Sequence, residues 1–160
     1  MATVELREVE DADSDAIFAQ MRDPEAVRMA AFTADDPDDR AAFDRHLTRL
    51  RTDPDITLRA ITEDGRLVGT IASFRVGADT EVTYWVDRAA WGRGIASRAL
   101  ALFLDVVTVR PMYARAAEDN AASLRVLRKA GFRDIGTERA YASARGEEIT
   151  EIVLRLDADR

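Results

Sequence analysis

The chain lacks cysteine altogether, and it has a single histidine among its 160 residues. Without a thiol there is no disulfide, no thiolate metal site and no cysteine acyl-enzyme. A histidine-based zinc site or a Ser-His-Asp triad would depend on His46 alone. We therefore expect no metal site, and we expect His46 to lie on a helix as a structural or solvent-facing residue.

The sequence also lacks a signal segment and an excess of positive charge. Residues 1–8 contain no basic region and no long apolar run, so we expect a cytoplasmic protein. The formal net charge of −7 argues against broad binding to nucleic acid or anionic membranes. It suits an amine-bearing partner, or it simply keeps the protein in solution. The composition, 47% hydrophobic and 33% charged, is that of a folded protein, and we expect one domain over residues 1–160.

Hydrophobic patterns divide the chain into strands and helices. Seven β-runs are expected, at residues 4–9, 56–62, 67–74, 81–86, 112–117, 132–139 and 149–156. Four helices are expected: one through Ile17 and Met21 that is interrupted at Pro24, one over about 38–51, one beginning at Ile95, and one over about 120–130. This order predicts an α+β domain with a mixed sheet of about seven strands, about four flanking helices and a central βαβ unit.

The segment 83–104 passes from a β-run through Gly92 and Gly94 into a helix. Two glycines at the start of a helix allow a bulky group to approach the backbone. The first turn also presents N–H groups without intrahelical partners at the positive end of the helix dipole, which suits a diphosphate. The alternative is that these glycines only make a tight turn. One face of the helix is expected to be buried through its apolar residues, which are Ile95, Ala99, Leu102, Phe103 and Val106.

Several short motifs together resemble a known family. They are Tyr84-Trp85-Val86, the run from Trp91 to Ala96 with its two glycines, Asn120-x-x-Ser123, and Lys129-Ala130-Gly131-Phe132. In this combination and spacing the chain resembles the GCN5-related N-acetyltransferases (GNATs). Within them it is most similar to the branch that acetylates the N-terminal alanine of ribosomal proteins. The resemblance covers nearly the whole chain, because the predicted strand order matches that fold as well.

The resemblance implies that acetyl-CoA is the cosubstrate and that no metal is needed. It places the phosphate loop at Gly92, Arg93, Gly94, Ile95, Ala96 and Ser97. It also places Trp85 and Val86 beside the pantetheine arm, and Asn120 and Ser123 near the thioester. Two positions depart from the family pattern. Trp91 stands where many members have Gln or Arg, and Leu127 stands where many have the tyrosine that protonates the leaving thiolate.

A thioester and an amine can react directly in a ternary complex, provided that an enzyme positions them, removes a proton and stabilises charge on the thioester oxygen. A backbone N–H on the open edge of the strand at 81–86 is the expected charge-stabilising donor. Glu81 is the candidate base, unless it is only a charged residue at a strand start. Ser123 is the candidate acid. Otherwise it merely occupies the first turn of a helix capped by Asn120, and water or Tyr84 protonates the thiolate.

Two other classes of protein are alternatives to an acetyltransferase. A dinucleotide-binding oxidoreductase would need a third glycine near position 97, which is serine here, and an earlier place for the motif in the chain. A noncatalytic acyl-CoA-binding module of the same fold is a second alternative. The acceptor amine is not determined: a protein N-terminus and a small-molecule amine both fit, and Phe32, Tyr141 and the segment 139–148 are places where it could contact the protein. A monomer and a homodimer are equally open.

Overall fold

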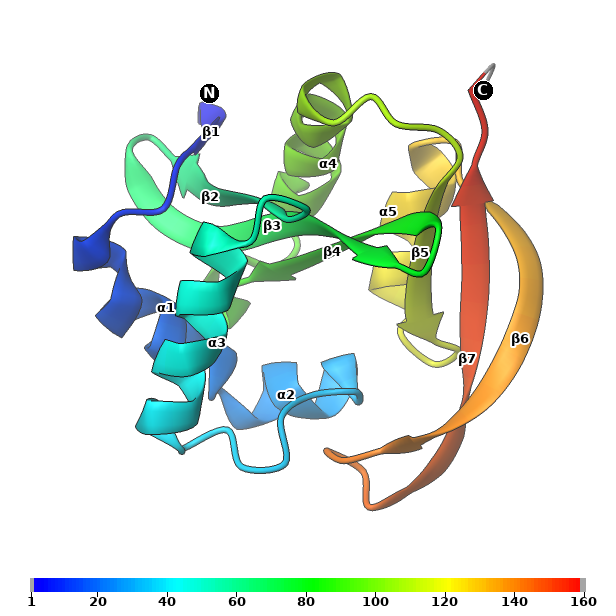
Figure 1. Cartoon of the computed structure of the whole chain (residues 1–160), viewed down its shortest axis with the longest axis horizontal. Coiled ribbons are helices and arrows are strands. Elements are labelled where there is room, and N and C mark those ends of the chain that lie inside the picture. The colour runs from blue at the N-terminus through cyan, green and yellow to red at the C-terminus, as the bar shows by residue number, and fades with distance from the viewer. Residues whose placement is uncertain (1, 159–160) are drawn as a thin grey trace.

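The computed structural model, which describes residues 2–158, contains seven strands and five α-helices in that range. They are β1 (Val4–Arg7), α1 (Ser14–Met21), α2 (Pro24–Ala30), α3 (Arg40–Thr52), β2 (Thr57–Glu63), β3 (Arg66–Val76), β4 (Asp79–Val86), α4 (Ile95–Val106), β5 (Met112–Ala117), α5 (Ala121–Lys129), β6 (Arg133–Ala142) and β7 (Glu147–Leu156). Figure 1 shows this arrangement. No helix in the described range is both long and apolar enough to cross a bilayer.

The seven strands form one mixed sheet in the order β1-β2-β3-β4-β5-β7-β6, and the mixed sheet of seven strands is as the sequence predicts. Every neighbouring pair is antiparallel except β4 and β5, which are parallel. These two strands pair only where Thr80 lies opposite Met112 and Glu81 lies opposite Tyr113. Beyond Glu81 the strands diverge, which leaves one edge of β4 open in the middle of the sheet.

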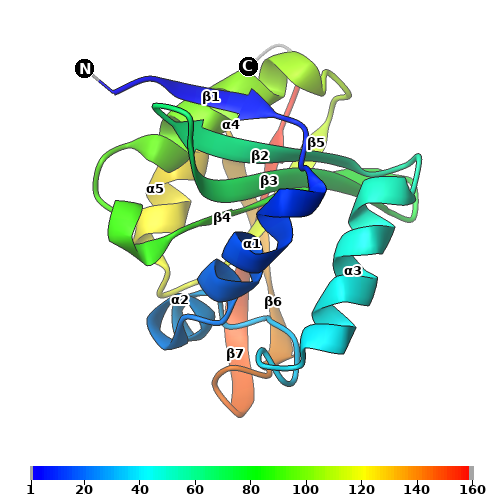
Figure 2. The same ribbon diagram turned by 90° about the vertical axis from the view of Figure 1, so that its left-hand side faces the viewer.

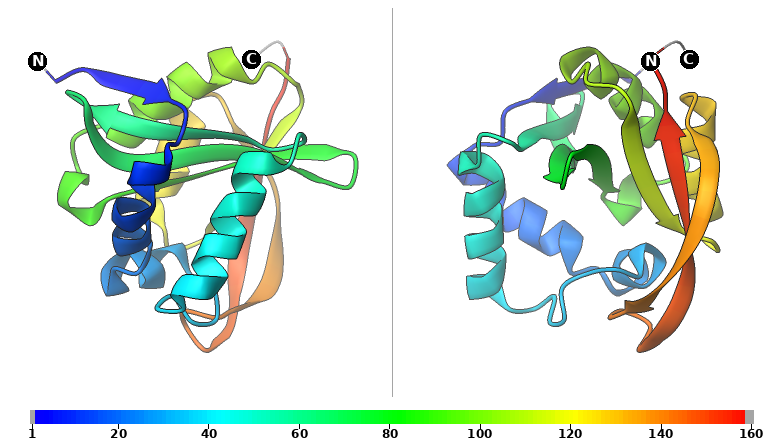
Figure 3. Two further views of the ribbon diagram at one scale, coloured as in Figure 1. Left: turned by 60° about the vertical axis from the view of Figure 1, so that its left-hand side comes forward. Right: turned by 45° about the vertical axis from the view of Figure 1, so that its right-hand side comes forward.

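Helices cover both faces of the sheet. Helices α1 and α3 lie over one face, and α4 and α5 lie over the other (Figure 2). The core under α4 and α5 includes Phe103 and Leu124, whereas a smaller core under α1 and α3 includes Ile17 and Leu47. At one end the β6–β7 hairpin extends past the sheet to α2 (Figure 3), where the Arg145 side chain donates to the Arg28 carbonyl.

The sequence predicts four helices, and the described part of the chain contains five. Helix α2 is the additional one. The Asp23 side chain accepts a hydrogen bond from the Ala26 N–H at 3.0 Å, and Pro24 occupies the first helical position. Proline is favoured there because its missing N–H would have no partner and its φ is already helical. Pro24, expected only to interrupt a helix, therefore also starts one.

The buried face of α4 is as predicted at Ile95, Ala99 and Phe103 and differs at the other two predicted positions. Leu102 and Val106 are 39% and 46% exposed, whereas Leu100 and Leu104 are 0% and 4% exposed. Helix α4 packs against β1 as well as against β3 and β4. Because α4 contacts β1, the side of the helix that carries Leu100 and Leu104 is buried. The helical pattern shows that apolar residues lie on adjacent sides of the helix, but it does not specify which side packs against another element.

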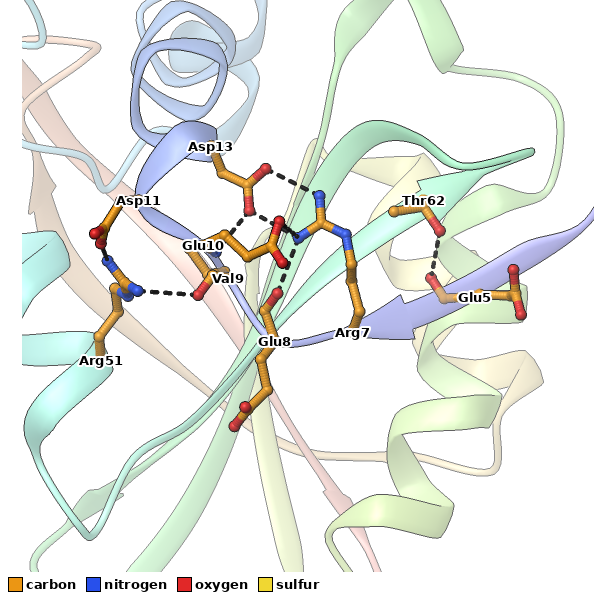
Figure 4. Close-up of polar contacts among 9 residues, drawn as sticks. All are labelled: Glu5, Arg7, Glu8, Val9, Glu10, Asp11, Asp13, Arg51 and Thr62. Atoms are coloured by element: carbon orange, nitrogen blue, oxygen red, sulfur yellow. Dashed lines mark hydrogen bonds and ion pairs between the residues drawn. The ribbon is translucent and has the colours of Figure 1, made fainter.

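A polar network fixes the start of α1 (Figure 4). Arg7 donates two hydrogen bonds to the Asp13 carboxylate, at 2.7 and 2.9 Å, and the Glu10 N–H donates to the same carboxylate at 2.7 Å. Arg51 on α3 donates to the Val9 carbonyl at 3.1 Å. The strand predicted to run to residue 9 therefore ends at Arg7, where the chain turns into α1, and the network links β1, α1 and α3.

Candidate active site

The glycine turn leaves the N-terminus of α4 uncapped. Gly92 and Gly94 have φ of 80° and 74°, in the left-handed region that favours glycine. Gly94 is the N-cap residue, and no side chain in the described range accepts from the helix start. Within residues 2–158, the N–H groups of residues 92–97 likewise find no backbone acceptor. These donors lie at the positive end of the α4 dipole, which makes the turn a ready anion site.

The Arg93 side chain does not line the groove beside this turn. Its guanidinium pairs with the buried carboxylate of Glu63 at 3.0 Å. Arg98 donates to the Arg93 carbonyl at 3.0 Å and to the Ala2 carbonyl at 3.1 Å. Arg93 was expected among the phosphate-loop residues, and what it can offer a phosphate is its backbone N–H rather than its charge.

The open edge of β4 presents backbone groups of Tyr84 and Val86. The Asp87 N–H donates to the Val68 carbonyl on β3 at 2.7 Å. Because hydrogen-bonding residues alternate along an antiparallel pair, the groups of residues 83 and 85 also face β3 and those of residues 84 and 86 face outward. The outward Val86 carbonyl already accepts from the Trp91 indole N–H at 2.8 Å. Among residues 2–158 the Tyr84 N–H, the Tyr84 carbonyl and the Val86 N–H have no partner, so they are available to a ligand.

A groove of about 460 Å³ runs from the glycine turn along this open edge. Gly92, Gly94, Ile95, Ala96 and Ser97 line one end of it, and Tyr84, Trp85, Val86, Asn120 and Ser123 line the other. Arg125 and Lys129 on α5 also line it, and neither forms an ion pair within the described range. These two cations were not expected from the sequence. Their i, i+4 spacing on the helix that begins after Asn120 is the signal that could have found them.

Asn120 and Ser123 lie at the start of α5. The Asn120 side chain accepts from the Ser123 N–H at 3.2 Å, so it acts as the N-cap that the sequence offered as its alternative role. The Ser123 hydroxyl lies 2.8 Å from the Tyr84 hydroxyl. Burial raises the pKa of Tyr84 to about 12, and the hydrogen bond with Ser123 partly offsets this. Tyr84 therefore keeps its proton at every physiological pH.

On the far side of Tyr84, the groove meets a second cavity of about 670 Å³. The two share Ala30, Tyr84, Trp85, Asn120 and Ser123 as lining residues. Trp85 is held from the α1 side, because its indole N–H donates to the Gln20 carbonyl at 3.1 Å. The shared lining shows that the groove and the second cavity adjoin at Tyr84, and we call the second cavity the acceptor cavity.

Two carboxylates of the acceptor cavity lie beside an arginine. Glu81 is 8% exposed, and its carboxylate lies 3.4 Å from the Arg115 side chain. Glu151 on β7 is also 3.4 Å from Arg115, which pairs with Glu138 as well. Burial raises the pKa of Glu151, although Arg115 opposes the effect. Glu151 was not expected from the sequence, because it lies far from Glu81 along the chain and approaches it only through the β5–β7 pairing.

Of the other places proposed for acceptor contacts, Phe32 lines the acceptor cavity. Tyr141, 63% exposed, and residues 139–148 do not line it. His46 is exposed on α3 and lies at the rim of the cavity, where burial on its inner side is the main cause that lowers its pKa. Within the described range no cluster of three or more His, Asp or Glu side chains could hold a metal ion.

The groove fits the acetyl-CoA expected from the sequence. The uncapped amides suit its diphosphate, and the unpaired Arg125 and Lys129 suit its phosphate charge. The open β4 edge can pair with the amides of an extended arm. Fold and groove together define the class of acyl-CoA-dependent acyltransferases.

Comparisons with known proteins agree with this class. Residues 3–133 match the family model described as an acetyltransferase (GNAT) domain. The N-alpha-acetyltransferase RimI of Mycobacterium tuberculosis is 33% identical over 122 residues, which are 73% of this chain and 75% of that protein. A mycothiol acetyltransferase of Clavibacter michiganensis is 31% identical over 146 residues, 76% of this chain but 47% of the relative. The solved structure of Mycobacterium smegmatis RimJ in complex with CoA-disulfide has a TM-score of 0.82, with 24% identity, and covers 98% of this chain and 82% of that one.

The chain belongs to the GNAT acetyltransferase family, whose members transfer the acetyl group of acetyl-CoA to an amine. It shares this fold with RimJ over nearly its whole length.

Proposed function

We propose that this protein transfers the acetyl group of acetyl-CoA to a primary amine, either a protein N-terminus or a small-molecule amine, by direct attack in a ternary complex. The observation that carries the proposal is that the groove at the uncapped amides of residues 92–97 adjoins, at Tyr84, the acid-lined acceptor cavity. The groove suits a diphosphate and the cavity suits an ammonium group, and the two meet at the divergence of β4 and β5.

Acetyl-CoA supplies the activated acyl group. The chain binds the diphosphate through the N–H groups of Gly92 to Ser97, and Arg125 and Lys129 contribute positive charge beside it. The outward N–H group of Tyr84 is placed to donate to the thioester oxygen as it gains charge, and that of Val86, two residues further along the strand, is placed to donate to the extended arm. Because these donors are fixed in a strand, they need no rearrangement during the reaction.

Glu81 is proposed to accept the proton of the acceptor ammonium. It lies in the acceptor cavity, on the face of β4 that points toward α1 and α3, and it is the carboxylate nearest in sequence to the open edge. Glu151 shares the cavity and adds negative charge that attracts the ammonium.

Ser123 is proposed to donate a hydrogen bond to the departing sulfur while Tyr84 donates to the Ser123 hydroxyl. An ordinary thiol has a pKa of roughly 8.5. Tyr84, with a pKa of about 12, is the weaker acid, so it acts as a hydrogen-bond donor and does not give up its own proton. The pair thus stabilises the departing thiolate, which takes its proton from water, and this replaces the direct proton transfer from the tyrosine that Leu127 replaces.

The name of the M. tuberculosis relative, an N-alpha-acetyltransferase, supports a protein N-terminus as one acceptor class. Our proposal includes a cytoplasmic location and partners limited to acetyl-CoA and the amine, without nucleic acid or membrane. Sedimentation measurements distinguish a monomer from a homodimer.

The test is to incubate the protein with acetyl-CoA and a panel of amines while free thiol release is measured. The panel holds alkylamines, amino acids, polyamines and short peptides with free N-termini. We expect acetyl-CoA to bind with or without an amine, and thiol release to require the amine. Binding without thiol release on every amine would instead identify a noncatalytic acyl-CoA-binding module.

A further inference from the structure

A third cavity, of about 400 Å³, adjoins the acceptor cavity between the α1 and α3 helices and the strands β2–β4. We call it the side compartment. The two cavities share Met21, Phe43, His46, Phe74, Thr83 and Trp85 among their lining residues. Thr83 is exposed although it lies in the middle of β4, on the same face as Trp85, whose indole donates to the Gln20 carbonyl of α1. Because Thr83 lines both cavities, solvent reaches the sheet where the two adjoin.

The interior of the side compartment is apolar. Besides the shared residues, its wall includes Ile17, Leu47, Leu50, Ile56, Leu58 and Ala72. Ile17, Leu47, Leu58 and Ala72 are each no more than 9% exposed. The volume lies within the range of small-molecule sites, which are mostly apolar with a few polar groups.

Charge in the side compartment is balanced. Two carboxylates, Asp53 and Asp55, and two guanidinium groups, Arg49 and Arg75, contribute to its lining. The Asp53 carboxylate already accepts from the Asp55 N–H at 2.9 Å, and both arginines are exposed. The acceptor cavity differs, because the carboxylates of Glu81 and Glu151 lie there beside the single Arg115. An ammonium group is therefore attracted to the acceptor cavity, and the side compartment favours uncharged apolar atoms.

We propose that the side compartment binds an apolar substituent of the acceptor, so that the preferred acceptor is a primary amine with an apolar chain or side chain attached close to the nitrogen. The inference rests on the proposed function. Glu81 and Thr83 lie on the same face of β4, separated by about 7 Å, which is two residues of strand rise. A short alkyl chain or an amino-acid side chain spans this distance. The amine stays at Glu81 while its apolar group enters beside Thr83.

The experiment measures kcat/KM for the series from ethylamine to hexylamine and for tripeptides that begin with Gly, Ala, Leu or Phe. In the acceptor class that reacts, kcat/KM should rise about fourfold for each added methylene, which corresponds to about 0.8 kcal/mol, until the compartment is full. Pentylamine should exceed 1,5-diaminopentane at least tenfold, because the second ammonium would lose water on entering an apolar interior whose two carboxylates are already balanced by two guanidinium groups.

Two variants test the location. Ala72→Phe fills the compartment and should reduce the ratio of kcat/KM for the long acceptor to that for the short one. Leu50→Ala enlarges the compartment and should move the optimum to a longer chain, which keeps the test valid if Ala72→Phe does not fold. Thr137→Phe, at an exposed strand threonine on β6 that lines none of the three cavities, is the matched control and should keep the original ratio.

The outcomes separate this inference from the proposed function. A flat dependence on chain length, a preference for the diamine, or an unchanged ratio in both folded variants would overturn the side compartment as an acceptor site while the acetyltransferase activity stands. Absence of turnover with every amine would overturn the proposed function, and this inference with it.

Discussion

At the residue scale, the anion site depends on the backbone of two glycines. A Cβ at Gly94 would meet no atom within 4 Å, so space alone does not require glycine there. What requires it is φ of 74°, which costs an L-residue about 1–2 kcal/mol. The turn is visible in the sequence because two glycines directly before a helical pattern are typical of a backbone with positive φ.

Gly94→Glu should reduce acetyl-CoA affinity at least 100-fold, because a carboxylate would stand among the donors of the anion site. Calorimetry with acetyl-CoA measures the change. Gly77→Glu is the matched control: Gly77 also has positive φ and open space around it, but it lies in the β3–β4 turn, away from the groove. Unchanged affinity in Gly94→Glu would remove the diphosphate from this turn.

Glu81→Gln should lower kcat about 100-fold or more, in the range usual for loss of a general base, with little effect on acetyl-CoA affinity. The comparison variant Glu151→Gln leaves Glu81 in place and should lower kcat much less. If Glu151→Gln shows the larger loss of kcat, Glu151 is the base.

At the scale of elements, the reaction centre is the contact between β4 and α5. The two are distant in sequence, and the Tyr84–Ser123 hydrogen bond joins them. Tyr84 and Ser123 both belong to motifs that are recognisable in the sequence, but no local sequence pattern predicts that they contact each other. Their pairing depends on how α5 packs against the sheet, and it is the packing that also buries Tyr84 and raises its pKa to about 12.

Ser123→Ala and Tyr84→Phe should each lower kcat about tenfold, and the double variant should be no worse than the more severe single one, because the two hydroxyls act as one unit. Tyr113→Phe on the neighbouring strand β5 is the control and should leave kcat unchanged. Additive losses, measured as kcat at saturating acetyl-CoA and amine, would show that the hydroxyls act separately.

At the scale of the whole molecule, the Arg7–Asp13 pair holds the start of α1, which in turn holds Trp85 through the Gln20 carbonyl. The hydrogen bonds from Arg7 lower the pKa of Asp13. A lowered pKa in the folded state means that this stabilisation is present above the unfolded pKa, about 3.9, and is lost as pH falls through the folded value.

Asp13→Asn should therefore lower the free energy of unfolding by about 2 kcal/mol at pH 7, a typical value for a charged hydrogen bond. The difference from the unmodified protein should shrink as the pH falls below about 4, where the unfolded carboxyl is protonated. Urea unfolding of the variant and of the unmodified protein, at pH 7 and at pH 3, measures the difference in the free energy of unfolding at each pH. Asp134→Asn, which removes an exposed partner of Arg128, is the control and should cost little at either pH. An equal cost of Asp13→Asn at both pH values would contradict the ionic origin.

The sequence by itself determined the seven strands, the mixed sheet, the glycine turn and the start of α5, because each depends on local preferences: alternation, backbone freedom at glycine, and capping by Asn120. Only the tertiary structure decided that Arg93 pairs with Glu63, and that Glu138 and Glu151 stand opposite each other and both pair with Arg115. It alone decided, too, that an apolar compartment opens beside Thr83. The physical reason is that ion pairs and cavities are made by side chains from separate elements, whose approach depends on strand register and helix packing rather than on any local pattern.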